Sequence, residues 1–294
     1  MEKGLLKKRA YIYLAILYGL LFIGWLLNLL LPEPYVQYAY SLLWGLFSVF
    51  PILSTFLTRK ITHDRSPWLL RPNFRKSWKT YLFAAFFPGA AIFLGALLFY
   101  VIFPHDLDLT ARNLVEQYSQ FGAPETLLLT PKTIFLVGIA FIFISPFIFP
   151  VHIFALGEEI GWRGYFLPIL LKLTNQRKAV ILHAVLWGLA HAPLIYLGFN
   201  YGSDYWGTPI TGIIMMTLVC VSLGTWLGFL TIKSGSILPA TIFHGAGNVI
   251  GELPLLVSYM SISSLLGPNP TGIIGLSGLM IGAIFIYFKL SKSN

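Results

Sequence analysis

The feature that most constrains this chain is a series of apolar segments long enough to cross a lipid bilayer. Two of them, 11–31 and 133–156, contain no charged residue over more than 20 positions. A helix needs about 20 apolar residues to cross a hydrocarbon core. Charged residues make up 11% of the chain, against roughly 25% in a typical soluble domain. The sequence therefore predicts an all-α, polytopic membrane protein.

The apolar segments predict eight spans around a polar site in the core of the bundle. Nearly all loop lysines and arginines fall in one alternating set of loops, and most loop aspartates and glutamates, Glu33 and Glu125 among them, fall in the other. The positive-inside rule then places both termini in the cytoplasm of a multi-pass protein of the cell membrane. The expected spans are 11–31, 36–57, 80–103, 139–171, 179–199, 210–232, 236–257 and 271–288.

The charge and the cysteine content narrow the function. The formal net charge of +9 lies in the loops, so it favours contact with anionic lipid headgroups on the cytoplasmic side and no nucleic-acid partner. The basic loop 58–79 fits an interfacial segment that anchors the topology. The single cysteine, Cys220, excludes a disulfide framework and a CxxC metal site. The basic segment 1–9 leads into the first span, which we expect to be retained.

Three charged residues lie inside the fourth expected span: Glu158, Glu159 and Arg163. Ionisable groups inside a bilayer are costly, so they face the protein interior and commonly mark function. Glu159 and Arg163 are four residues apart, which allows a buried ion pair on one helix face. Glu158 is turned by about 100° from Glu159 and can address a different neighbour.

Polar residues of two later spans lie at a similar depth. His244 and Asn248 are four residues apart, so both side chains point the same way. With a rise of about 1.5 Å per residue, Glu158, His191, His244 and Asn248 lie about 16 to 22 Å from the cytoplasmic boundary. Three spans therefore contribute polar groups to one layer near the middle of the membrane.

This layer suits the hydrolysis of an amide bond. A carboxylate beside a histidine, as with Glu158 and His191, can activate water. His244 and Asn248 can donate hydrogen bonds to a developing oxyanion. This mechanism requires no cofactor. Glu158, His191 and His244 also form a two-histidine, one-glutamate set of the kind that binds zinc, and the sequence leaves both mechanisms open.

Three motifs in this order resemble the CPBP family, which comprises CAAX proteases and bacteriocin-processing intramembrane proteases. The family pattern is EExxxR, an aromatic residue with xxxH, and HxxxN or HxxxD. Here these motifs begin at Glu158, Trp187 and His244, and Trp187 stands where phenylalanine is commoner. The resemblance covers roughly residues 135–255.

The resemblance implies an intramembrane endopeptidase that acts on a peptide or protein substrate, in some relatives a prenylated one. It implies that Glu158 and His191 activate the water, that His244 and Asn248 form the oxyanion hole, and that Glu159 and Arg163 support them. The relatives are described either as glutamate-dependent or as metalloproteases. We expect an N-terminal membrane region at 1–134, the catalytic core at 135–255, and a last span with a cytoplasmic tail at 256–294.

Two other functions stay open at this stage. Carboxylates and histidines in mid-membrane also serve transporters, although the chain shows no inverted repeat. A family member can also act by binding alone, for example in self-immunity to a bacteriocin. Retention of every expected catalytic residue argues against this loss of proteolysis.

Overall fold

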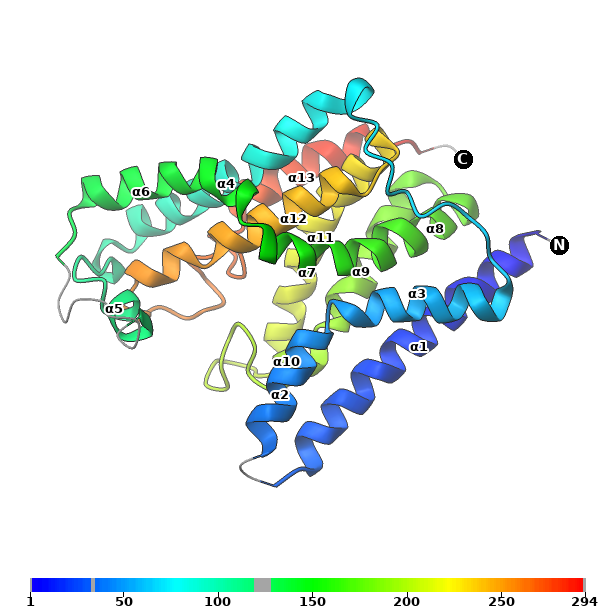
Figure 1. Ribbon diagram of the computed structural model, residues 1–294. Coiled ribbons are helices and arrows are strands. Elements are labelled where there is room, and N and C mark those ends of the chain that lie inside the picture. The colour runs from blue at the N-terminus through cyan, green and yellow to red at the C-terminus, as the bar shows by residue number, and fades with distance from the viewer. Residues whose placement is uncertain (1, 33–34, 119–127, 293–294) are drawn as a thin grey trace.

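The computed structural model describes residues 2–32, 35–118 and 128–292. These residues form helices joined by loops (Figure 1), and among them the only extended pairing is a bridge between Leu107 and Ser258. The predicted all-α class is confirmed. The elements are α1 (Glu2–Leu30), α2 (Tyr35–Leu46), α3 (Val49–Thr62), α4 (Phe74–Ile102), η1 (Pro104–Asp106), α5 (Arg112–Tyr118), α6 (Pro131–Ile144), η3 (Ser145–Phe147), α7 (Phe149–Gly161), η4 (Trp162–Phe166), α8 (Leu167–Leu173), α9 (Gln176–Ala190), α10 (Ala192–Tyr196), α11 (Ile210–Ser234), α12 (Leu238–Gly251), η5 (Leu253–Val257) and α13 (Ser277–Lys289).

Among the residues that the structure describes, four to six of the expected eight spans are long and apolar enough to cross a membrane. Helices α1, α4 and α11 and the α9–α10 segment meet this criterion singly, and two bent helix pairs meet it as units. The expected spans at 236–257 and 271–288 contain the shorter helices α12 and α13, of 14 and 13 residues. Helix α13 begins only at Ser277 because the preceding segment, which contains Pro270 and several glycines, forms turns. Glu33 and Glu125, which the orientation argument uses, lie outside the described residues.

Both bent pairs have their break beside the predicted site. Helices α2 and α3 meet at 59°, and so do the α6–η3 and α7–α8 segments. In the second pair Pro146 and Pro150 flank the break at Ile148. Because proline has no backbone N–H, neither of them can donate the hydrogen bond that would continue the helix. After Gly161 the chain forms the π-helical turn η4, a local irregularity that often marks functional sites.

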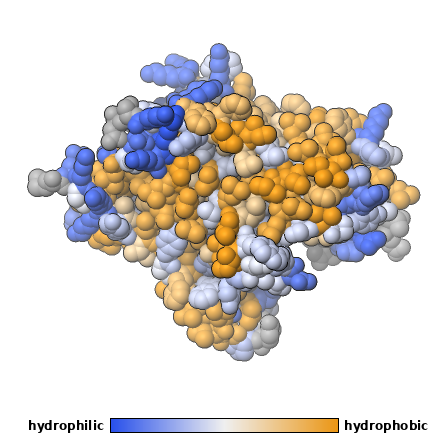
Figure 2. Space-filling model, turned by 180° about the vertical axis from the view of Figure 1, so that it is seen from behind, coloured by the Kyte–Doolittle hydropathy of each residue, from blue (hydrophilic) through white to orange (hydrophobic). Residues whose placement is uncertain are grey.

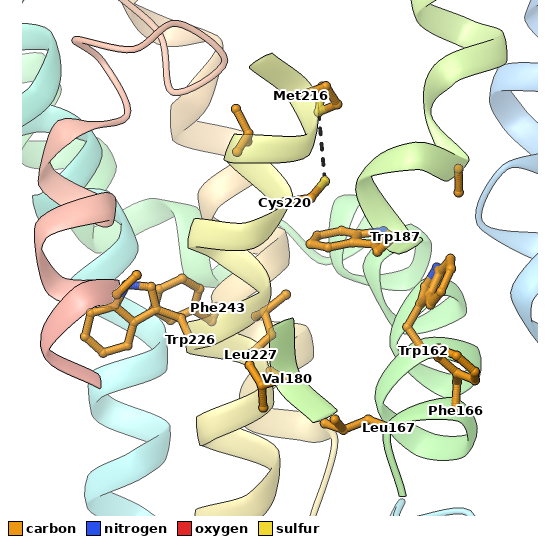
Figure 3. Packing of buried hydrophobic residues seen from close by; sticks show 14 of the residues in the cluster. Trp162, Phe166, Leu167, Val180, Trp187, Met216, Cys220, Trp226, Leu227 and Phe243 are labelled. Carbon is orange, nitrogen blue, oxygen red and sulfur yellow. Dashed lines mark hydrogen bonds between the residues drawn. The ribbon is translucent and has the colours of Figure 1, made fainter. Parts of the chain in front are cut away.

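Helix α12 lies in the middle of the bundle. It packs against α4, α7 and α11, while α9 packs against α11 and α3 against α7. Large aromatic side chains fill the spaces between these helices, and Figure 3 shows Trp226 of α11 beside Phe243 of α12, with ring centroids 5.9 Å apart. This packing fixes α7, α9 and α12, which bear the predicted site residues.

Two glycines allow the site helices to approach their neighbours closely. A Cβ atom on Gly157 would lie 2.5 Å from the carbonyl oxygen of Ser48, and one on Gly245 would lie 2.7 Å from the ring of His152. Gly157 therefore places the α2–α3 break against the helix that carries Glu158. Gly245 places His152 of α7 against α12, next to His244.

The outer surface is that of an integral membrane protein. Figure 2 shows apolar side chains over the middle of one face, with hydrophilic residues gathered toward its two ends. Large apolar side chains such as Phe22, Phe56 and Phe285 are exposed. The two chain ends lie on the same side of the molecule (Figure 1).

Candidate active site

A buried ion pair lies at the end of α7. Arg163 Nη1 donates to Glu159 Oε1 over 2.9 Å, and both side chains are completely buried. The predicted pairing of these two residues is therefore present. Removing one partner of such a pair is strongly destabilising, because the other charge is left uncompensated.

His244 of α12 is hydrogen-bonded to the same carboxylate oxygen. Its Nδ1 lies 2.9 Å from Glu159 Oε1. Because a carboxylate oxygen accepts, His244 donates through Nδ1, and the other ring nitrogen, Nε2, is turned away from Glu159. Glu159 thus joins α7 to α12. Its hydrogen bond to Nδ1 also fixes the orientation of the His244 ring and leaves Nε2 available.

Trp187 of α9 contacts four members of the predicted site, which are Glu158, Arg163, His244 and His191. Its Nε1 donates to Glu158 Oε2 over 2.8 Å, which joins the first two motifs. The Arg163 guanidinium carbon lies 4.0 Å from the centroid of the Trp187 ring, and the ring of His244 meets it edge-on at 5.3 Å. The indole is therefore the common element around which Glu158, Arg163 and His244 are arranged.

His191, at the end of α9, completes this cluster. Its Nδ1 lies 2.9 Å from the backbone carbonyl of Trp187, and since a carbonyl only accepts, Nδ1 carries the proton. When the ring is neutral, Nε2 then holds the lone pair that a general base needs. The ring of Phe47, from the α2–α3 break, lies 4.6 Å from the His191 ring, and Cys220 Sγ lies 3.8 Å from Nδ1.

Exposure separates the two glutamates. Glu158 and His191 retain 8% and 9% of their accessible surface, whereas Glu159 and Arg163 retain none. A substrate approaching the cluster therefore meets Glu158 and His191 first. Glu159 and Arg163 lie behind them.

Asn248 is the predicted site residue that the structure does not bring into this cluster. It lies one turn beyond His244 on α12 with an exposed side chain, and its amide makes no hydrogen bond to any described residue. His183 of α9 is fully buried against the rings of Trp162 and Phe166. Neither of its ring nitrogens has a hydrogen-bond partner among the described residues.

Sequence reasoning missed two contributors. Trp187 was noted only as the aromatic position of the second motif, although its N–H is the group that reaches Glu158. Phe47 lies more than 100 residues before the motifs in the sequence, and nothing around it predicts contact with His191.

The cluster does not fit a zinc site in this arrangement. Within the described residues no three histidine, cysteine, aspartate or glutamate side chains are grouped so that they can hold a metal ion. We therefore derive no chemical step through a metal.

Comparison with known proteins identifies the segment that carries this cluster. Residues 133–250 match the family described as "Type II CAAX prenyl endopeptidase Rce1-like". A relative from Methanococcus maripaludis, "CAAX prenyl protease 2", is 32% identical over 109 residues, which cover 37% of this chain and 40% of the relative. The chain thus matches less than half the length of this curated relative. The matched segment lies almost wholly within the expected core 135–255, and the division of the chain into three parts stays a prediction.

Proposed function

We propose that this integral membrane protein is an intramembrane endopeptidase, because residues 133–250 match the Rce1-like family of type II CAAX prenyl endopeptidases. The observation that carries the proposal is the cluster around Trp187, which joins the three motifs. It holds Glu158 by a hydrogen bond, His191 through its backbone carbonyl, and His244 by an edge-on ring contact.

In the proposed reaction, Glu158 and His191 activate a water molecule. The carboxylate of Glu158 is fixed at Oε2 by Trp187, and His191 presents its Nε2 lone pair. One of these groups accepts a proton from the water while the oxygen forms a bond to the scissile carbonyl carbon. When the C–N bond breaks, the same proton passes to the leaving amine, so that the products are a carboxylic acid and an amine.

His244 and Asn248 stabilise the negative charge that develops on the carbonyl oxygen. His244 donates Nδ1–H to Glu159, so it serves the oxyanion through Nε2 with a proton on both ring nitrogens. Asn248 lies one turn away on the same helix, and its exposed amide is free to meet a peptide that lies along α12. Glu159 and Arg163 support His244 from behind.

The substrate class follows from the family. A CAAX-type endopeptidase acts on a peptide or protein, and we propose a substrate whose C-terminal segment enters the bundle from the basic side of the membrane. The distribution of loop charges supports an orientation in which that side and both termini lie in the cytoplasm. Processing of a bacteriocin or another unmodified peptide is the alternative within the same chemistry.

A reconstituted assay tests the proposal. The purified protein in liposomes is offered a C-terminal peptide in prenylated and in unmodified form, and cleavage is followed by mass spectrometry. Cleavage by the wild type and its loss in the His191→Ala variant support the proposal. The preferred peptide distinguishes CAAX processing from general peptide processing. Solute flux without a peptide product would instead favour a transporter. Immunity to a bacteriocin that survives loss of both Glu158 and His191 would favour a binding protein.

A further inference from the structure

A cavity with a basic lining lies outside the candidate active site, at the end of α3. Its volume is about 390 Å³, and we call it the basic pocket. Its position at the start of the basic loop 58–79 places it on the side of the molecule that carries most of the loop lysines and arginines. The residues that line it are Phe56, Arg59, Lys60, His63, Asp64, Arg65 and Trp68.

Arg59 is held in place at the wall of the basic pocket. Its guanidinium donates to the backbone carbonyl and the hydroxyl of Ser66, and its central carbon lies 4.2 Å from the centroid of the Trp68 ring. Asp64 Oδ1 accepts from the Ser66 backbone N–H over 2.9 Å, which closes the turn. A cation ordered in this way loses little conformational freedom when it binds an anion.

The lining has an excess of positive charge. The side chains of Arg59, Lys60 and Arg65 face one carboxylate, that of Asp64. Arg9, which does not line the pocket, already pairs with Asp64 over 3.4 Å. Lys60 and Arg65 are exposed and form no ion pair with any described residue. The pocket therefore offers cations that an anionic group can neutralise.

The same pocket has an apolar wall. Phe56 lies about one turn before Lys60 on α3 and exposes 56% of its surface, and Leu53, one turn further from the charges, is also exposed. An occupant that matches both walls has an anionic head and an apolar tail. Arginine and lysine bind phosphate groups well, and tryptophan favours the membrane interface.

From this combination we propose that the basic pocket binds an anionic phospholipid. Its phosphate lies among Arg59, Lys60 and Arg65, and an acyl chain runs along Phe56. The proposal depends on no assumption about catalysis at Glu158.

Native mass spectrometry of the purified protein tests the proposal by measuring how much phosphatidylglycerol it retains as the lipid is titrated in neutral detergent. The test variant carries Lys60→Gln with Arg65→Gln. The matched control carries Arg75→Gln with Lys76→Gln, which removes the same charge from exposed positions in the first turn of α4, outside the pocket. We expect the test variant to bind phosphatidylglycerol about 30-fold more weakly, because each cation lost near a lipid surface weakens binding about fivefold. The control is expected to change less than about threefold.

A competition measurement and a further variant identify the ligand. Phosphatidylcholine, and inorganic phosphate added alone, should not compete with phosphatidylglycerol, and Phe56→Ala should weaken lipid binding while leaving the protein folded. Equal weakening in the test and control variants would overturn the proposal in favour of a diffuse charge effect. Full competition by inorganic phosphate, with no effect of Phe56→Ala, would overturn it in favour of a soluble phosphate ligand.

Discussion

Trp187 Nε1 donates a 2.8 Å hydrogen bond to Glu158 Oε2, which joins two motifs that lie on different helices. A phenylalanine at this position would keep the aromatic ring but not the donor. The bond therefore gives this chain a specific means of fixing the carboxylate proposed to activate water. The carbonyl of the same residue accepts from His191 Nδ1, so both members of the proposed water-activating pair are positioned by Trp187.

The first prediction concerns this bond. Trp187→Phe should lower kcat by about tenfold or more, because a hydrogen bond to a charged group contributes about 1.5–3 kcal/mol, while KM stays nearly unchanged. The matched control is Trp226→Phe, which removes the buried hydrogen bond from Trp226 Nε1 to the Leu279 carbonyl on α13. We expect the control to lose stability to a similar degree and to keep its kcat. Equal kcat for both variants would show that Trp187 only packs.

The second prediction separates the two adjacent glutamates. Glu159→Gln leaves the buried Arg163 without its partner and should lower the free energy of unfolding by about 3–5 kcal/mol. Glu158→Gln should leave the protein folded, since Glu158 accepts only from Trp187 among the described residues. Thermal unfolding in detergent measures both changes. A stable Glu159→Gln variant beside an unfolded Glu158→Gln variant would reverse the assigned roles.

The third prediction concerns metal. Since the described residues contain no group of three metal-binding side chains, cleavage should persist after exhaustive chelation, and metal analysis of the purified protein should give no stoichiometric zinc. Bound zinc that disappears in the His191→Ala variant would contradict this prediction. It would show that the side chains rearrange to bind a metal.

The fourth prediction concerns the loop after α4. Burial favours a higher pKa for Asp108, but hydrogen bonds from Thr110 and from the Arg112 backbone outweigh it and hold the pKa below its ordinary value of 3.8. A carboxyl whose pKa is lowered by folding contributes stability above the unfolded pKa and loses it as the pH falls through the folded one. The protection factors of the Thr110 and Arg112 amides, which compare their exchange rates with those of an unfolded peptide at the same pH, should therefore fall below pH 3.8.

Asp108→Asn is the control for this pH effect. It should lower the protection factors of the Thr110 and Arg112 amides at neutral pH. It should also remove their further fall at low pH. An unchanged pH dependence in Asp108→Asn would assign the effect to another carboxyl, such as that of Asp106, which binds Ser258 and Ser261.

The sequence predicts the parts of the site that follow from spacing along one helix. The pairing of Glu159 with Arg163 is a local property of a helix, and the apolar segments define most of the spans. The partner of His244 was not predictable in this way, because it depends on how α7 is rotated against α12. The rotation of α7 against α12 is set by packing between residues that are distant in the sequence. One such contact is that of the His152 ring with Gly245.

Long-range features explain the remaining differences. Phe47 reaches His191 only because α2 and α3 break at that point and pack on Gly157. The depth of Asn248 was predicted from a straight helix, but depth does not determine which face of α12 is covered, and the Asn248 side chain is exposed. Hydrophobic periodicity cannot supply such information.

The measurement that tests the central claim most directly compares wild type and Glu158→Gln, expressed at equal levels in the same native membranes. All new peptide termini are then identified by mass spectrometry. The account predicts termini that occur only with the wild type, with a loss of at least about 100-fold in the variant. Identical sets of termini from both folded proteins would contradict proteolysis at this site.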